Sequence, residues 1–598
     1  MANKIPKRSE VRVEDTWNLT DIFPNDEAWL AEYKELQNAP AKVAAHKGKL
    51  GESAKNLLVW FEEQDELSVR LTKFYGYASC KSDEDTGNGT YQDFRAKAIS
   101  TIVAISSAAA FATPEIMAIE EETLDSFYAA EPKLETYRRS LYQIRRRKAH
   151  ILSPAEEKLL AGAGEMANAP EQIGSVLRDA DMTYPDVTDG EGNVHPLTDG
   201  TLVPLLMSSD RELRKNTFQT YYKRLGEFRN TIAATLDAQF RQLKFYANAR
   251  SYSSTIEASL DNTEVPVPVY LNLIEAVHQN LPKMYRYVAL RKKIMGVDEL
   301  HMYDVYPPII PDADIKISFE EAKKTVLEAL AVLGEDYTAL LRQGFENRWI
   351  DIYENVGKRG GAYSSGNSYP HPYVLLNHKD NLDSMFTLAH EMGHALHSYH
   401  SCKYQPTNTA DYVIFVAEVA STCNEVLLMR YLLNKTTDKK QRAYLINHFL
   451  DQFKGTVYRQ TMFAEFELTM GKMTEQNETL TADALCEKYH ALNKLYFGED
   501  MISDDEIALE WARIPHFFYN YYVFQYATGF SAAVAIANRI LKEGAPAVAD
   551  YKKFLSGGSS ADPISLLKIA GVDMSTPDPV NSALELFGSL VDELETLI

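Results

Sequence analysis

The sequence predicts a mostly α-helical protein with a small β element, and two observations lead to this class. Apolar and aromatic residues recur every three and four positions over long stretches, as on the buried face of a helix. These stretches cover residues 54–79, 134–148, 210–250, 318–344 and 439–537. Elsewhere, glycines and prolines at 360–372 precede the β-prone run at 373–376. That pattern is typical of a loop that leads into a short strand.

The predicted helices fall into an N-terminal lobe and a larger remainder. Residues 27–180 are interpreted as successive helices, and residues 182–205 as a small hairpin whose turn contains Gly190 and Gly192. Proline-containing segments at 265–268 and 306–308 predict rigid connectors between later helices. We therefore expect an N-terminal helical lobe over 1–200 and a second domain over 201–598.

The composition argues for a soluble protein that does not bind nucleic acid. Apolar residues make up 45% and charged residues 24% of the 598 positions, which is ordinary for a globular protein with a sizeable core. The formal net charge is −22, from 62 basic and 84 acidic residues. Binding to a phosphate backbone requires a basic surface, so this charge argues against a nucleic-acid partner.

Three features favour a cytoplasmic location. The four cysteines are scattered and form no Cys-x-x-Cys motif, which fits a reducing compartment. The N-terminal residues are charged and lack the apolar core of a secretion signal. The longest uncharged run worth testing as a membrane span, 98–114, has five Ser or Thr and ends in proline, so we interpret it as a buried helix. No feature indicates an oligomeric state.

The segment His390-Glu391-Met392-Gly393-His394 predicts a metal site. Residues four apart on a helix share one face, so His390 and His394 can converge on one ion. Glu391 lies about 100° round the helix, where it can act as base toward a water on a zinc ion without binding the metal. A random chain of this composition would contain the pattern roughly 0.03 times.

A catalytic zinc site needs three protein donors, so a third must come from downstream. His400 is one candidate, but the position where related motifs carry glycine is occupied here by His397. If the helix continues, His400 lies about 9 Å along the axis from His394 and cannot close the site. We therefore interpret His397 and His400 as polar residues at a helix end.

Glu418 is the favoured third donor. Turn-forming residues at 401–410 predict a loop, and a second helix is expected over about 412–433. Glu418 would lie a turn or two inside that helix, facing the two histidines. Glu425, two turns further on, is either an acceptor that orients a ligand or a surface ion-pair residue.

The sequence around these residues resembles the oligoendopeptidase F branch of the thimet oligopeptidase family. The likeness is carried by the segments 387–394 and 415–422, by 360–377 before the motif and by 513–529 after it, and it covers nearly the whole chain. The resemblance implies that His390, His394 and Glu418 bind one zinc ion per chain. It also implies a mostly helical, bowl-like zincin whose deep channel admits peptides and excludes folded proteins, with the catalytic domain over 201–598.

An aromatic block after the motif supplies candidate hydrogen-bond donors. His516, Tyr519, Tyr522 and Tyr526 follow helical spacing and would face the same region. An imidazole and phenols there can stabilise the oxyanion of a tetrahedral intermediate. The resemblance supports a histidine and tyrosines in this role, and which phenol acts stays open.

Together these observations predict a zinc-dependent endopeptidase that cleaves short unfolded peptides, with Glu391 as general base. The strand after residue 372 could offer an exposed edge to an extended peptide. One alternative is a carboxypeptidase or dipeptidyl carboxypeptidase on the same scaffold. The other is a noncatalytic peptide-binding protein with a structural zinc, which would need a closed four-donor site.

Overall fold

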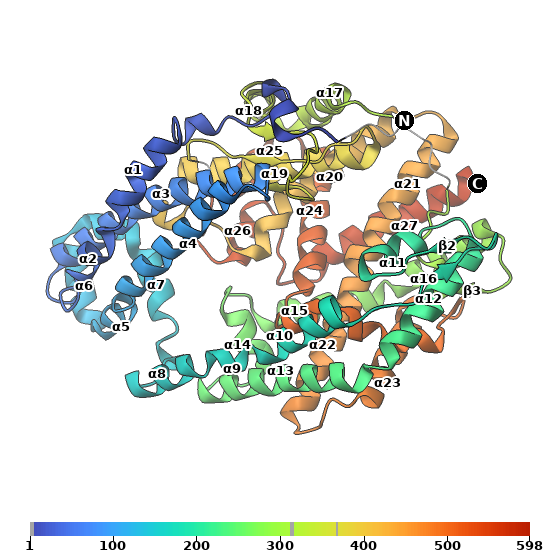
Figure 1. The fold of residues 1–598 in the computed structure, drawn as a ribbon, viewed down its shortest axis with the longest axis horizontal. Coiled ribbons are helices and arrows are strands. Elements are labelled where there is room, and N and C mark those ends of the chain that lie inside the picture. The colour runs from blue at the N-terminus through green and yellow to red at the C-terminus, as the bar shows by residue number, and fades with distance from the viewer. Residues whose placement is uncertain (1–4, 311–315, 366–368) are drawn as a thin grey trace. The chain divides into compact units, whose positions relative to one another are not determined.

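The chain folds into two units, each built mainly of helices (Figure 1). The structure is a computed structural model and describes residues 5–310, 316–365 and 369–598. Unit 1 comprises the described residues of Met1–Lys148, Asp314–Leu428 and Ile536–Gly571. Unit 2 comprises those of Ala149–Ala313, Met429–Ala535 and Val572–Ile598. The predicted mostly helical class is confirmed, and the division into 1–200 and 201–598 stays a prediction.

Unit 1 contains twelve helices within the described residues, and two more helices cross between the units. The twelve are α1 (Asp26–Leu36), α2 (Ala39–Ala44), α3 (Ala54–Glu84), α4 (Gly89–Ala109), α5 (Ala112–Ala118), α6 (Glu121–Ala130), α7 (Arg138–Arg145), α17 (Phe319–Ala329), α18 (Glu335–Glu346), α19 (Leu382–Tyr404), α25 (Ala545–Leu555) and α26 (Pro563–Ile569). The two that cross are α20 (Ile414–Lys435) and α24 (Phe524–Glu543).

The described part of unit 2 has thirteen helices. They are α8 (Pro154–Gly162), α9 (Gly164–Ala167), α10 (Ala169–Val176), α11 (Asp199–Leu206), α12 (Arg211–Gly226), α13 (Arg229–Ala249), α14 (Thr255–Asp261), α15 (Val267–Gln279), α16 (Leu281–Met295), α21 (Lys439–Phe453), α22 (Arg459–Glu475), α23 (Ala482–Phe497) and α27 (Asp578–Leu597). Two 3₁₀ segments, η11 (Asp505–Arg513) and η12 (Pro515–Phe518), precede α24.

Among the described residues the strands are two residues long and form three small sheets. The predicted hairpin is confirmed as β1 (Val187–Thr188) paired antiparallel with β2 (Val194–His195). In unit 2, β3 (Leu300–His301) pairs with β7 (Met501–Ile502). In unit 1, β4 (Ile350–Asp351), β6 (Val374–Leu375) and β5 (Tyr363–Ser364) form a sheet in the order β4-β6-β5.

This last sheet corrects the predicted edge. The β-prone run after residue 372 does form a strand, but β6 is the central strand of the sheet. The edge strand beside it is β5, which comes from the segment interpreted as loop. A chain-distant partner, β4, pairs with β6 on its other side, and nothing local in the sequence indicates that pairing.

An aromatic stack fixes α1, α3 and α4 in unit 1. Trp29 is fully buried and stacks on Phe74 and Phe94, with ring centroids 4.5 and 4.1 Å apart. Its indole N–H donates to the Phe74 carbonyl over 2.8 Å, so the buried polar atom is satisfied. The same cluster includes Leu375 of β6, which ties the small sheet to these helices.

The uncharged run at 98–114 is helical, but the expectation of a buried helix is wrong. It spans the end of α4 and the start of α5, and Ile99 and Val103 are exposed. Within the described residues, Gly89–Ala118 is apolar and long enough to cross a bilayer by length and composition. One such stretch is weak evidence for a membrane span, and this one is divided between two helices.

Helices α19 and α20 form an antiparallel pair with unusually close backbones. A Cβ atom at Gly393 would lie 2.5 Å from the Cα atom of Ser421 and 2.9 Å from the Ala420 carbonyl oxygen. Nearer the start of α19, the Asn424 side chain donates to the carbonyl oxygen of Ala389 over 3.1 Å. Glycine at position 393 therefore sets the distance between these helices, and Asn424 fixes their register.

We predict that Gly393→Ala lowers the thermal unfolding midpoint of zinc-free protein. Overpacking against backbone atoms costs about 1–3 kcal/mol, more than the roughly 1 kcal/mol that alanine gains in helix propensity. Gly89→Ala is the control, because a Cβ atom there meets nothing within 4 Å. Calorimetry of both variants in chelator checks this; an unchanged midpoint for Gly393→Ala would contradict the close packing.

Candidate metal centre

The metal motif lies in the middle of α19. Asn381 caps this helix by accepting a hydrogen bond from the Ser384 amide over 2.9 Å. Because the helix is regular through the motif, His390 and His394 lie on one face, and their ring centroids are 4.8 Å apart. The predicted arrangement of the two imidazoles is therefore present.

Glu418 reaches both imidazoles from α20. Its Oε2 atom lies 3.3 Å from Nε2 of His390 and 3.3 Å from Nε2 of His394. The two Nε2 atoms are 3.1 Å apart. Two nitrogens and one carboxylate oxygen therefore form a compact triangle, and the structure brings together the three donors that the sequence predicted.

The dimensions of this triangle fit a zinc ion. Zinc binds histidine nitrogen and carboxylate oxygen at about 2.0–2.2 Å, which places neighbouring ligand atoms of a tetrahedral site roughly 3.3–3.5 Å apart. The observed separations of 3.1–3.3 Å are close to that range. Three protein donors in this arrangement can hold zinc and leave a fourth position for water or substrate.

Glu425 orients the first histidine. Its carboxylate contacts Nδ1 of His390, so Nε2 is the nitrogen that faces the triangle. Burial opposes a charge on His390, but hydrogen bonds with Glu418 and Glu425 raise the pKa of its imidazole to about 10. The same carboxylates would compensate the charge of a bound dication. Of the two interpretations of Glu425, the orienting acceptor agrees with the geometry.

Glu391 lies beside the triangle without belonging to it. The residue is buried, and burial raises the pKa of its carboxyl group against the opposing influence of His390 and His394. The backbone of Ser364 in β5 lies near this carboxylate and acts to lower its pKa. The edge strand therefore contacts the proposed base directly, a contact that no sequence pattern had indicated.

The interpretation of His397 and His400 as helix-end residues is wrong. Helix α19 continues to Tyr404, and both histidines are buried. Burial lowers their pKa values, to about 3 for His397 and about 4 for His400, so both imidazoles stay neutral. His397 stacks on Tyr412 at a centroid distance of 3.8 Å, which indicates a packing role.

The aromatic block forms a second cluster, in the part of the chain assigned to unit 2. The hydroxyl oxygen of Tyr526 lies 3.4 Å from Nε2 of His516. The ring centroids of Tyr519 and Tyr522 lie 5.4 and 6.3 Å from that of the imidazole. Burial, reinforced by the charge of Arg459, lowers the pKa of His516. A neutral imidazole and three phenols are thus gathered in one place.

The prediction that His516 and the three tyrosines lie on one helix is wrong. The segment passes from the 3₁₀ turn η12 through Asn520 and Tyr521, both at positive φ, before α24 begins at Phe524. Two consecutive residues in the left-handed region break a helix. The buried Tyr521 hydroxyl lies 2.8 Å from Thr255, so tertiary contacts hold this turn.

Comparison with known proteins agrees with the fold and the metal cluster. The model of peptidase family M3 matches residues 205–586, and an oligopeptidase F model matches 115–184. The chain is 48% identical to oligopeptidase PepF of Bacillus subtilis over 597 residues, covering 100% of this chain and 89% of that protein. An oligoendopeptidase F homologue of Lactococcus lactis is 40% identical, with 99% and 98% covered.

Solved structures give the same result. The oligoendopeptidase F structure from Enterococcus faecium is 39% identical with a TM-score of 0.74, covering 96% of this chain and 99% of its own. A structure from Chlamydophila abortus is 34% identical with a TM-score of 0.93, and both chains are covered fully.

The fold, the metal cluster and these relatives define a metallo-oligopeptidase. The chain belongs to peptidase family M3, and within it to the oligoendopeptidase F group.

We predict that the cluster binds one zinc ion and that Glu425 tunes its affinity. His390→Ala should abolish stoichiometric binding because it removes a donor, and Glu425→Gln should weaken binding about 10–100-fold because it removes only the orienting acceptor. Competition with a zinc-sensitive dye measures both. His195→Ala, in the β1–β2 hairpin, is the matched control and should bind like wild type. Wild-type affinity in Glu425→Gln would argue against the orienting role.

Proposed function

We propose that this protein is a zinc-dependent endopeptidase that hydrolyses internal bonds of short unfolded peptides. The observation that carries the proposal is the position of Glu391, buried next to a three-donor metal cluster but outside it. A structural zinc site is closed by four protein ligands and needs no adjacent base. The arrangement around Glu391 therefore favours hydrolysis over a noncatalytic peptide-binding role.

In the proposed mechanism, His390, His394 and Glu418 hold the metal. Bound zinc supplies Lewis-acid chemistry, which lowers the pKa of a water molecule and polarises a carbonyl group. Glu391 accepts a proton from the attacking water as the water oxygen adds to the scissile carbonyl carbon. Glu391 then passes the proton to the amide nitrogen as the C–N bond breaks, so one water is consumed for each bond cleaved.

His516 and the tyrosines beside it are the proposed donors to the oxyanion. A neutral imidazole can donate through one ring nitrogen, and a phenol donates through its hydroxyl. Donors aimed at a developing negative charge stabilise the tetrahedral intermediate more than the substrate. Tyr526 is close enough to His516 to orient its ring. Tyr519 and Tyr522 are therefore the phenols proposed to donate to the substrate oxyanion.

The edge strand β5 is the proposed docking site for the substrate backbone. An extended peptide that adds to a sheet edge is bound through main-chain hydrogen bonds, which permits many side chains. The contact from Ser364 to Glu391 supports this, because a peptide on β5 would lie close to the base. A channel that excludes folded proteins, implied by the resemblance, belongs to the same proposal.

We also propose that this enzyme is cytoplasmic and that its partners are peptides. It is proposed to bind neither nucleic acid nor a membrane. The charge of −22 and the scattered cysteines support it.

Burial raises the pKa of the Cys423 thiol, which lies near Glu418 in the sequence, to about 12, so this thiol is unreactive at neutral pH.

We predict that Glu391→Gln retains zinc and loses turnover by about 10²–10⁴-fold, the range for removing a general acid-base group. The glutamine keeps the size of the side chain but cannot accept a proton from water. Zinc content and single-turnover peptide cleavage are measured on the same sample. Substantial hydrolysis by a zinc-loaded variant would refute the assigned role.

We predict that His516→Ala lowers kcat by about 10²–10³-fold with a smaller change in KM, because the donor acts mainly in the transition state. Tyr519→Phe and Tyr522→Phe, measured in parallel, identify the phenol that contributes. Tyr142→Phe, at an exposed position on α7, serves as the control. A loss confined to KM would place His516 in substrate binding instead.

Digestion of a peptide mixture with and without chelator, followed by mass spectrometry, tests the function as a whole. The proposal expects chelator-sensitive cleavage at internal bonds, including bonds of peptides blocked at both ends. Products shortened only from free C-termini would favour the carboxypeptidase alternative, and cleavage that resists chelator would overturn the metal-dependent mechanism.

A further inference from the structure

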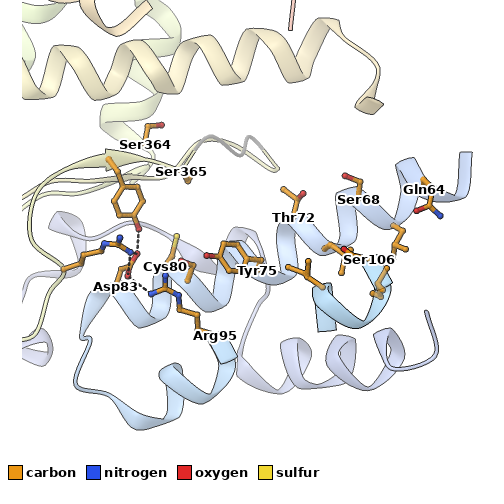
Figure 2. A pocket seen from close by; sticks show the side chains of 18 of the residues that line it. Gln64, Ser68, Thr72, Tyr75, Cys80, Asp83, Arg95, Ser106, Ser364 and Ser365 are labelled. Carbon is orange, nitrogen blue, oxygen red and sulfur yellow. Dashed lines mark hydrogen bonds and ion pairs between the residues drawn. The ribbon is translucent and has the colours of Figure 1, made fainter. Parts of the chain in front are cut away.

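Unit 1 contains a cavity of about 800 Å³ between α3, α4 and the segment that leads into β5 (Figure 2). Part of its lining is apolar and comes from Leu67 and Leu71 of α3 and from Ile102 and Ile105 of α4. Polar groups from α3 and β5 line other parts of the cavity, and Figure 2 shows Ser68 and Thr72 along the same helix. The cavity therefore presents both an apolar wall and polar groups to a ligand.

The cavity reaches the proposed active site through β5. Ser364 lines it, and the backbone of the same residue lies near the Glu391 carboxylate. Arg359, which also lines the cavity, precedes Ser364 by five residues, so at most roughly 18 Å of extended chain separates the two positions. A substrate that pairs with β5 would therefore bring groups within about five residues of its scissile bond to this cavity.

The charged side chains of the cavity are unbalanced. Among the described residues that line it, the charged ones are Asp83, Arg95 and Arg359. Asp83 Oδ1 lies 3.3 Å from Nη1 of Arg359 and 3.8 Å from Nη1 of Arg95, and the Tyr363 hydroxyl donates to Oδ2 over 2.7 Å (Figure 2). Two guanidinium groups thus share one carboxylate, so the described residues that line the cavity carry a net charge of +1.

The positive and negative side chains that line the cavity differ in their exposure. The Asp83 side chain is 2% exposed, whereas those of Arg95 and Arg359 are 34% and 49% exposed. Each guanidinium carries five N–H donors, and Asp83 is contacted through Nη1 in both cases. A ligand in the cavity therefore meets exposed donors and a net positive charge, in a chain whose own net charge is −22.

We propose that Arg95 and Arg359 form a carboxylate-binding subsite that selects peptides carrying a carboxylate within about five residues of the bond to be cleaved. The inference rests on the proposed endopeptidase function and adds a substrate class to it. Planar guanidinium groups match the geometry of a carboxylate, and the adjacent apolar wall accepts a neighbouring side chain. The carboxylate is either the free C-terminus of the peptide or an Asp or Glu side chain.

The test uses one neutral peptide with a single susceptible bond, prepared in three forms. The first has a free C-terminus, the second is amidated, and the third is amidated with Glu in place of Gln at successive positions two to five residues from the bond. The ratio of kcat/KM to that of the neutral amide is measured for zinc-loaded wild type. Partly exposed charge-assisted hydrogen bonds predict a preference of roughly tenfold, which falls as salt is added.

Variants test which residues carry the preference. Arg95→Gln or Arg359→Gln leaves one guanidinium against Asp83, so either single change should bring the ratio close to 1. Asp83→Asn should raise it above the wild-type value because it removes the compensating charge. Arg359→Lys, which keeps the charge, should retain part of the preference. Arg70→Gln is the matched control: Arg70 lies on α3, pairs with Glu32 and does not line the cavity, so the ratio should stay that of wild type.

A ratio compares two substrates on one protein sample, so partial unfolding of a variant cancels. Preference for the free C-terminus alone identifies the terminal carboxylate as the ligand, and preference for a Glu form identifies the side chain. Equal cleavage of all forms by wild type, or an undiminished preference in both Arg→Gln variants, overturns the subsite and leaves the endopeptidase standing. Absence of cleavage of every form overturns the endopeptidase and the subsite with it.

Discussion

The close packing of α19 against α20 is the constraint on which the metal centre depends. A carboxylate oxygen must come within about 3.3 Å of two imidazole nitrogens that belong to another helix. Glu418 is less than one turn from Ser421, the residue whose Cα atom would meet a side chain at position 393. If the helices stood apart at the distance that ordinary side chains impose, the short glutamate could not close the triangle. The glycine inside the motif therefore has a structural task that is separate from metal binding.

Electrostatics around the triangle follow from the same pair of helices. Glu418 and Glu425 lie two turns apart on α20 and approach opposite nitrogens of His390. Glu418 contributes a ligand oxygen to the triangle. Glu425 selects the tautomer of His390 in which Nε2 is free to bind a metal. The two carboxylates beside His390 would compensate the charge of a bound dication.

The small sheet connects this centre to the proposed substrate. Strand β6 is anchored to the aromatic core through Leu375, and it holds β5 at the edge with Ser364 beside Glu391. The cavity with Arg95 and Arg359 opens from the same strand. The position of the proposed base, the docking edge and the charged cavity therefore all depend on β5. This strand has only two residues, and it is stable because β6 and the helices support it.

Much of this protein could be predicted from its sequence, because the relevant signals are local. Helical periodicity indicated the fold class, and spacing within one helix placed His390 beside His394. The turn residues Gly190 and Gly192 likewise predict the hairpin. Helix geometry favours Glu418 over His400 as the third donor, and the family resemblance implies the same residue.

Other features were decided by contacts between distant parts of the chain. The burial of His397, the edge position of β5 and the turn that gathers His516 with its tyrosines follow from packing that no local pattern encodes. Asp83, Arg95 and Arg359 come from three elements, so their shared charge exists only in the fold. The sequence by itself determined which chemical groups are available and which helix carries the metal motif. Only the tertiary structure decided which of those groups meet, because hydrogen bonds and ion pairs form over a few ångströms of space irrespective of separation along the chain.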